Sequence, residues 1–572
     1  MKFSAPFYIF QQPMQRLNYF HCCYLIAIFI YSCKKDDAPP APVIPPAPAS
    51  FAFNSLSVNS VFNGFTYYNV NSAPLVKMTF TAALDPATVN TSVILKDNSG
   101  AAAPFTATIE TDSILLITPA GLSPISKYVL SISNALRSKA GGGLQSPVAV
   151  NLTTALDSTD KFPRISDSAL LTLVQQQTFK YFFDFAHPVS GLARERNTSG
   201  DVVTTGGSGF GVMALVTGVN RNFISRAQGL DRMTIIVNFL TNSAKSYHGA
   251  FPHWMNGATG ATVNFSDNDD GADLVETSYL MQGLLTARQY FNGSNATETT
   301  LRSAINALYN KVEWNWFRQN AQNVLYWHWS PDKAFIINMP VKAWNEAMIV
   351  YALAASSPVD SNRITKNVYD SGWAANGAMK NGKQFYGITL PLGPDFGGPL
   401  FFAHYSFLGI NPAGLTDAYA DYWTQNQNHS LINYNYCITN PGKFNGYSSS
   451  VWGLTASDEE NGYSAHSPTN DDGIISPTAA ISSLPYTPVQ SMNAIRFFYY
   501  TMGNKIWSQY GFTDAFNLTD IWFADTYLAI DQGPEIIMIE NYRSGLLWNL
   551  FMSCPEIKTG MKSLGFQSPQ LN

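Results

Sequence analysis

Two hydrophobic patterns follow one another along the chain. In residues 51–155, short runs alternate between apolar and polar positions and are separated by turn residues. The clearest of these runs are Leu75–Phe80, Ile114–Thr118 and Tyr128–Ile132. Alternation with a period of two is typical of half-buried β-strands, and regular short strands over this length predict a small β-sandwich.

A helical pattern begins after a polar joint near Lys161. Ser166 is predicted to cap a helix over ALLTLVQQQTFKYFFDF, and Thr487-Pro488 to begin another. One face of a third helix carries apolar side chains at Leu301, Ile305, Leu308 and Val312. Residues 160–572 are therefore predicted to form a large, mainly helical domain. Periodicity alone leaves a bundle, a solenoid and a toroid open.

The segment Arg16–Cys33 has the pattern of a secretion signal. One basic residue precedes about a dozen apolar ones, which are too few for a membrane span of about 20 residues. The segment ends in Ile30–Cys33, which resembles a bacterial lipobox. We therefore expect residues 1–33 to be a lipoprotein signal peptide and Cys33 to be lipidated. An ordinary signal peptide or a short anchor is the alternative.

The residues after Cys33 indicate an exported protein. Lys34–Asp37 look like the surface-export signal of Bacteroidetes lipoproteins, and residues 34–50 form a proline-rich linker. We expect an outer-membrane lipoprotein whose folded domains are held away from the cell surface by this linker.

Composition narrows the class of ligand. The net charge is −5 over 572 residues, which gives no support for nucleic-acid binding. Charged residues are 13% of the chain, about half the share in ordinary soluble domains, whereas aromatic residues reach 14%. This balance suits a neutral, hydroxyl-covered ligand. Cys437 and Cys554 are the only cysteines beyond residue 33, so a disulfide scaffold is excluded.

The densest acidic stretch is SDNDDGADLVETSYLMQGLL. A helix that begins near Gly271 would place Asp269, Asp273 and Glu276 on one face of its N-terminal end. Three carboxylates packed together repel one another, so at least one pKa rises and a proton donor becomes available. A calcium loop does not fit the spacing. A solvated acidic helix start remains open.

Two further segments offer acids. Glu346 lies in VKAWNEAMIVYALAA, predicted to be an apolar helix, where an unpaired carboxyl is costly and is easily kept protonated. A core acid paired to a base is the alternative. In DQGPEIIMIENYRSGLLW, Gly533-Pro534 suggests that Asp531 projects from a loop, and Glu540 is expected to pair with Arg543.

Other residues near these acids could contact a ligand or belong to the core. Sugar rings stack on aromatic side chains, and candidates for such contacts are His253, Trp254, Trp329, Trp344 and Tyr405. The glycine runs 205–211 and 397–399 lack the following Lys-Ser/Thr of a phosphate loop. His466 near Asp471 and Asp472 is a weak metal signal. The acids 458–460 suggest no role.

Five motifs occur in the order of a known family. They are FSDNDDGADLVETSYLMQGLL, VKAWNEAMIVYALAA, GGPLFFAHYSFLGINP, AHSPTNDDGIISPTAAISSLPYTP and DQGPEIIMIENYRSGLLW. Together they resemble the glycoamylase-like domain of glycoside hydrolase family 144, over most of residues 160–560. The resemblance implies an (α/α)6 toroid with its cleft at one end of the inner helix ring. It also implies inverting hydrolysis of β-1,2-glucan. The stretch VKMTFTAALDPATV resembles bacterial Ig-like domains.

The resemblance also suggests residue roles. We expect Glu346 as the general acid and Asp531 as the general base, with Asp273 in the catalytic centre. The substrate contacts are expected from Asp269, Glu276, His253, Trp254, Trp329, Trp344, Tyr405 and Arg543. No metal or cofactor is required, the partner is a β-glucan, and the protein is expected to be a monomer.

Several functions remain in competition. An endo-acting β-1,2-glucanase leads, and an exo enzyme that releases sophorose differs from it only in loops that close one end of the cleft. A surface glycan-binding lipoprotein without catalysis would not need Glu346. A polysaccharide lyase would need a Tyr/His pair with an arginine, and no such cluster is evident in the sequence.

Overall fold

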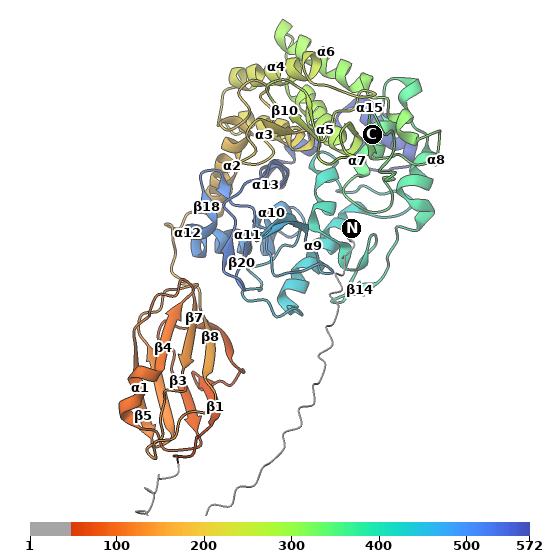
Figure 1. The fold of residues 1–572 in the computed structure, drawn as a ribbon. Coiled ribbons are helices and arrows are strands. Elements are labelled where there is room, and N and C mark those ends of the chain that lie inside the picture. Colours follow the sequence, from red (N-terminus) through yellow and green to blue (C-terminus); the bar gives the residue numbers. More distant parts are fainter. Residues whose placement is uncertain (1–46) are drawn as a thin grey trace, which may run out of the picture.

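The computed structural model describes residues 47–572. The signal peptide, the lipidation of Cys33 and most of the proline-rich linker concern residues outside this range. A β-sandwich and a much larger helical domain follow each other along the chain (Figure 1). Within residues 47–572, no helix combines the length and the apolar character that crossing a membrane requires.

The sandwich consists of two four-stranded sheets. One has the order β1 (Phe53–Val58), β3 (Val76–Phe80), β6 (Ile114–Pro119), β5 (Phe105–Thr111). The other has the order β2 (Thr66–Val70), β8 (Val148–Thr154), β7 (Lys127–Ile132), β4 (Val93–Asp97). The three strands predicted from alternation are confirmed as β3, β6 and β7. In β3, Val76, Met78 and Phe80 face the core, as a period of two requires.

The helical domain consists of an inner ring of helical segments surrounded by an outer ring of helices, which confirms the expected toroidal fold. Nearly every residue of the inner segments is buried, whereas the outer helices bury one face. The inner segments are α3 (Thr205–Asn220), α5 (Leu274–Tyr290), α7 (Met348–Ala355), the 3-10 turns η6 (Leu400–Ala403) and η7 (Tyr405–Leu408), α10 (Pro477–Ser482) and α13 (Ala529–Ser544). The outer helices include α2 (Asp167–Phe183), α4 (Arg226–Asn242), α6 (Ala296–Lys311), α9 (Tyr422–Thr439) and α11 (Pro488–Arg496). The ring closes where α13 packs against α3 (Figure 1).

Helices α3 and α5 cross backbone to backbone at two glycines. A Cβ added at Gly209 would lie 2.2 Å from the carbonyl oxygen of Tyr279, and one added at Gly283 would lie 2.1 Å from that of Gly209. Such distances exclude any side chain. The first glycine run of the sequence therefore serves helix packing.

Local signals located several helices correctly. Ser166 caps α2 and accepts a hydrogen bond from the amide of Ala169 at 3.3 Å. The predicted face of α6 is buried, from Leu301 to Leu308. Helix α11 begins at Pro488, as predicted, although Thr487 makes no side-chain cap bond.

Three boundaries near the predicted acids differ from expectation. Helix α5 begins at Leu274 because Asp273 is its N-cap, so Asp269 lies outside the helix. Helix α7 begins at Met348, and Glu346 lies in the turn before it. Asp531 lies in the first turn of α13, which continues through Pro534. Tertiary packing overrides the Gly-Pro signal there, since a Cβ at Gly533 would lie 2.4 Å from Cβ of Phe210.

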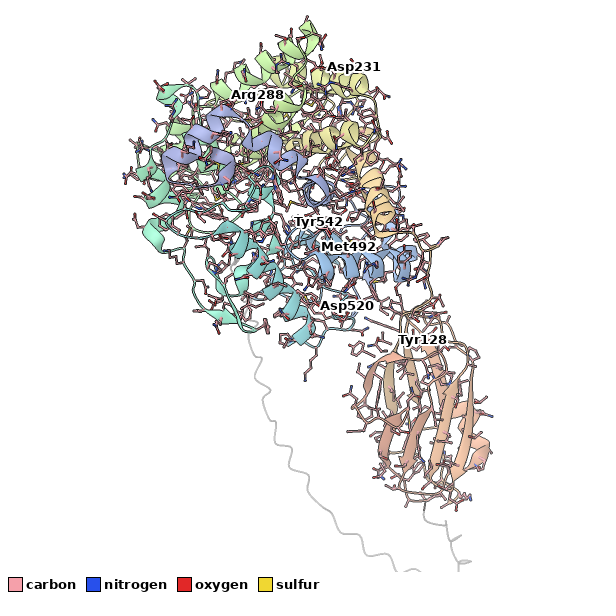
Figure 2. All side chains as sticks on the ribbon, turned by 180° about the vertical axis from the view of Figure 1, so that it is seen from behind. Tyr128, Asp231, Arg288, Met492, Asp520 and Tyr542 are labelled. Carbon is pink, nitrogen blue, oxygen red and sulfur yellow. The ribbon has the colours of Figure 1, made fainter. Side chains whose placement is uncertain are left out.

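The sandwich meets the helical domain through a small contact. Ile125 of the sandwich packs against the hydrophobic cluster around α2 and α11. Lys127 lies 3.4 Å from Asp520, which Figure 2 shows at the end of the helical domain nearest Tyr128. An exposed ion pair of this kind contributes at most about 1 kcal/mol.

Candidate active site

A cavity of about 400 Å³ lies at one end of the inner ring. The N-terminal ends of α3, α5, α7 and α13 meet there, together with η6 and η7. These ends contribute Thr204, Glu276, Glu346, Phe401, Tyr405, Leu528 and Ile530 to the wall. Because the N-terminal end of a helix carries partial positive charge, this arrangement favours carboxylates at the cavity.

One group of acids at the cavity is organised around two histidines, and we call it the histidine group. It comprises His253, His328, Asp269, Asp273, Glu276 and Glu346. Nδ1 of His253 lies 3.1 Å from Asp273 and 3.6 Å from Asp269, and Nε2 of His328 lies 3.5 Å from each of the same carboxylates. Burial alone would lower the pKa of His253, but Glu276, Asp269 and Asp273 outweigh it and hold that pKa well above the usual value.

Asp273 anchors the histidine group and is wholly buried. Its Oδ1 accepts hydrogen bonds from the amides of Val275 and Glu276, both at 2.9 Å, and its Oδ2 accepts one from Nε1 of Trp327 at 3.2 Å. Burial raises the pKa of Asp273, but His253, His328 and the amide of Glu276 more than reverse this and lower it. Asp273 is therefore an ionised carboxylate that positions its neighbours.

Glu276 joins α5 to the start of α3 and also faces the cavity. Its Oε2 accepts hydrogen bonds from the amide of Gly206 at 2.7 Å and from Oγ1 of Thr204 at 3.3 Å. Burial and the charge of Asp273 raise the pKa of Glu276 to about 7, despite the opposing effect of His253. The prediction that packed carboxylates raise at least one pKa is confirmed, although the three acids do not share a helix face.

Glu346 also lines the cavity, from the turn before α7. The turn that holds it is fixed because its carbonyl oxygen accepts hydrogen bonds from Oγ of Ser406 and from Oη of Tyr279, the latter at 3.4 Å. Burial, together with the charges of Glu276 and Asp273, raises the pKa of Glu346 to about 7. A carboxyl with such a pKa is a proton donor near neutral pH.

A second group of acids is organised around one arginine, and we call it the arginine group. It comprises Glu195, Arg196, Asp458, Asp514 and Asp531. Arg196 lies 3.0 Å from Glu195 and 3.1 Å from Asp458, and the Glu195 and Arg196 side chains line the cavity. Oδ2 of Asp514 accepts a hydrogen bond from the amide of Asp458 at 2.7 Å.

Asp531 and Asp514 form a buried pair in the arginine group. They are 2% and 1% exposed, so neither charge is solvated by water. Burial and Asp531's acidic neighbours, chiefly Asp514, raise the pKa of Asp531 well above its usual value, and burial with the charge of Asp458 raises the pKa of Asp514 to about 7. Two carboxyls in this situation hold one proton between them near neutral pH. Asp531 reaches the cavity through Tyr405, whose hydroxyl lies 3.5 Å from Oδ1 of Asp531.

The structure brings most of the predicted site residues together. His253, Trp254, Glu276, Glu346 and Tyr405 line the cavity. Asp269 and Asp273 contact it through His253, and Asp531 through Tyr405.

Three of the predicted substrate contacts lie elsewhere. Trp344 is buried against Phe407 and Tyr422, and Trp329 packs on His248 and Trp316. Neither ring forms part of the cavity wall.

Arg543 also lies outside the cavity. It occupies the last turn of α13, about 18 Å along the helix from Asp531 at the usual rise per residue. Its guanidinium donates to Thr172 at 2.9 Å and to Gln175 at 2.8 Å. The expected pair of Glu540 with Arg543 is wrong, because Glu540 pairs with Arg221 at 2.6 Å across to α3.

Several cavity residues gave no signal in the sequence. They are Glu195, Arg196, Phe265, Tyr279, Phe401 and Tyr463. Arg196 meets Asp458 across 262 residues, a separation that no local pattern encodes. The aromatics of this set are indistinguishable in sequence from core residues such as Trp344.

Comparison with known proteins gives consistent similarities. Residues 338–555 match the family model named Glycoamylase, and residues 56–154 match that of a bacterial Ig-like domain. A curated relative, the exo β-1,2-glucooligosaccharide sophorohydrolase (non-reducing end) of Parabacteroides distasonis, is 46% identical over 423 residues. That match covers 70% of this chain but 58% of the relative, less than two thirds of its length.

Two solved structures are also similar. The endo-β-1,2-glucanase from Chitinophaga pinensis, in complex with sophorotriose and glucose, is 52% identical with a TM-score of 0.69, and the match covers 71% of this chain and 100% of that one. A β-1,2-glucanase from Parabacteroides distasonis is 36% identical with a TM-score of 0.68, and the match covers 90% of this chain and 73% of that one. The second match is long enough to include the sandwich.

Proposed function

Because the chain belongs to glycoside hydrolase family 144, we propose that it hydrolyses β-1,2-glucan and that it cuts within the glucan chain. The observation that carries this proposal is Glu346, a carboxyl with a pKa raised to about 7 on the wall of an aromatic-lined cavity. Glycoside hydrolysis needs such a group to protonate the departing oxygen.

The second requirement of an inverting hydrolase is a carboxylate that activates water. We assign this role to Asp531. The pair that it forms with Asp514 retains one negative charge while holding one proton, and Tyr405 links it to the cavity. In the proposed reaction Glu346 gives its proton to the leaving sugar hydroxyl. The attacking water gives its proton to the carboxylate pair as the new C–O bond forms.

The cavity offers both polar and aromatic side chains for contacts with a sugar chain. Glu276 and His253 can hydrogen-bond sugar hydroxyls, while Trp254 and Phe265 contribute aromatic rings to the cavity wall. Asp269 and Asp273 hold His253 protonated, so that it donates.

Internal cutting is favoured by the similarity to the Chitinophaga pinensis enzyme, which is covered along its full length at 52% identity. The alternative is release of sophorose from a chain end, favoured by the 46% identity to the curated exo enzyme. The experiment that separates them is product analysis of linear β-1,2-glucan treated with the purified protein, beside Glu346→Gln. A ladder of oligosaccharides that is absent with the variant supports an endo-hydrolase.

Other outcomes are equally informative. If sophorose is the sole early product, the enzyme acts from a chain end and the proposal of internal cutting is wrong. Intact glucan in both reactions, with glucan bound to the protein, would leave a glycan-binding protein and overturn the enzymatic proposal.

We further propose that the protein is an exported, monomeric lipoprotein attached to the outer membrane through Cys33. The support is the sequence alone, from the lipobox-like Ile30–Cys33 and the following Lys34–Asp37. Membrane fractionation of cells carrying the wild type and Cys33→Ser tests the anchor. Release of the variant, but not of the wild type, into the soluble fraction is the expected result.

A further inference from the structure

A second cluster of potential ligands lies beside the cavity, in a β-hairpin. Strands β16 (Ala456–Glu459) and β17 (Gly462–Ala465) are antiparallel, and Ala456 and Tyr463 of this hairpin contribute to the cavity wall. Glu459 is the last residue of β16, and His466 follows β17 directly. The loop after it carries Asp472.

His466 has an unsatisfied imidazole in this cluster. The side chain is 0% exposed, and neither ring nitrogen has a hydrogen-bond partner among residues 47–572. Nε2 lies 3.8 Å from Oε2 of Glu459, beyond hydrogen-bonding distance. Leaving a buried polar group unpaired costs stability, so an imidazole in this position calls for a ligand.

Glu459, His466 and Asp472 each offer one atom, and the three atoms lie within 4.8 Å of one another. We propose that these residues bind a divalent metal ion of the zinc class. Ligand atoms about 2.1 Å from a tetrahedral ion lie about 3.4 Å from one another, so modest side-chain rotations close the site. An imidazole nitrogen with two carboxylate oxygens suits Zn²⁺ better than Ca²⁺ or Mg²⁺, which prefer oxygen ligands alone.

The surroundings of the three residues fit an ion that enters from solvent. Glu459 is half-buried and Asp472 is exposed, while His466 forms the closed end of the site.

The other histidine–carboxylate cluster is less suited to a metal. His253, Asp269 and Asp273 also lie close enough to share an ion. However, both oxygens of Asp273 already accept hydrogen bonds from Val275, Glu276 and Trp327. The metal site is therefore assigned to the hairpin and not to the histidine group.

A metal in this position would serve structure rather than chemistry. It would tie the end of β16 to the loop around Asp472, and would thereby hold Tyr463 at the cavity wall. The binding free energy would add to the stability of the folded chain.

The test is calorimetric titration of the EDTA-treated, tag-free protein with Zn²⁺, together with its melting temperature with and without the ion. We expect one Zn²⁺ per chain and a higher melting temperature when it is bound. Glu459→Gln and Asp472→Asn should each weaken binding at least tenfold. Both replace residues that reach solvent, so the variants should fold. Glu460→Gln makes the same charge change at the exposed neighbouring residue and should bind like the wild type.

Two results would overturn the assignment. One is the absence of Zn²⁺ binding by the wild-type protein. The other is an affinity that both ligand variants leave unchanged, which would place the ion elsewhere. If Asp269→Asn alone abolished binding, the ion would belong to the histidine group. These readouts do not depend on hydrolysis, so they stand or fall separately from the proposed function.

Discussion

The histidine group and the arginine group each bring four acids to one cavity, but they balance the charge differently. In the histidine group, Asp273 receives hydrogen bonds at both oxygens and lies close to His253 and His328. Its ionisation is thereby secured, and its charge helps to keep Glu346 protonated. In the arginine group, one guanidinium faces Glu195 and Asp458, which leaves Asp514 and Asp531 to share a proton.

The difference separates the two chemical roles. A fixed negative charge beside Glu346 favours the protonated form, as a general acid requires. A pair of carboxyls with a single proton keeps one ionised oxygen and can take a further proton, as a base requires. The same physical effect, repulsion between buried carboxylates, thus supplies a donor in one group and an acceptor in the other.

The largest expected effect comes from removing the proposed donor. Glu346→Gln keeps the shape of the side chain but cannot release a proton, so kcat on β-1,2-glucan should fall about 10²- to 10⁴-fold with little change in KM. Steady-state kinetics, with Glu110→Gln in the sandwich as a matched control, measures this. An unchanged kcat with a raised KM would assign Glu346 to binding alone.

The next effect distinguishes the two members of the buried pair. Asp531→Asn should lower kcat at least about 10²-fold if Asp531 is the base. Asp514→Asn should retain most activity at its optimum. It removes a like charge, so the pKa of Asp531 falls and the acidic limb of the kcat/KM profile moves to lower pH. Asp525→Asn, on the surface of the same region, is the control. If the acidic limb stays in place, Asp531 is not the base whose ionisation determines that limb.

A smaller effect is expected in the histidine group. Glu276→Gln removes a charge that raises the pKa of Glu346. The donor must be protonated, so its pKa governs the alkaline limb of the kcat profile, and that limb should move to lower pH by on the order of one unit. A movement to higher pH would show that Glu276 acts on Glu346 in the opposite sense.

The smallest effect is on stability. The pKa of Glu346 is about 7 in the folded chain against an ordinary value of 4.5, so ionisation destabilises the fold as the pH rises between these values. Glu346→Gln should match the wild type below pH 4.5 and exceed its unfolding free energy above pH 7, by at most about 3 kcal/mol. Denaturant unfolding at both pH values measures the difference. Equal stability at high pH would indicate that Glu346 is well solvated.

The sequence predicts the parts of this molecule that local patterns encode. Alternation located β3, β6 and β7, and capping chemistry located the start of α2. The meeting of Asp269, Asp273 and Glu276 was predicted, but on a helix face. In the structure it depends on Asp273 as a cap and on His253, which directly precedes strand β10 (Trp254–Asn256).

The remainder depends on contacts between distant segments. The link from Arg196 to Asp458 and the pair of Asp514 with Asp531 arise only when the ring closes. Trp344 and Trp254 look alike in sequence, yet one fills the core and one lines the cavity. Arg543 lies in the same motif as Asp531, but the length of α13 separates them.

The division of roles between Glu346 and Asp531 is tested most directly with an aryl β-sophoroside, whose leaving group departs without a proton. We predict that Glu346→Gln, strongly impaired on β-1,2-glucan, comes within about tenfold of the wild type on the aryl substrate, whereas Asp531→Asn remains impaired on both. Recovery by Asp531→Asn, with Glu346→Gln equally impaired on both substrates, would contradict the assignment of Glu346 as the acid.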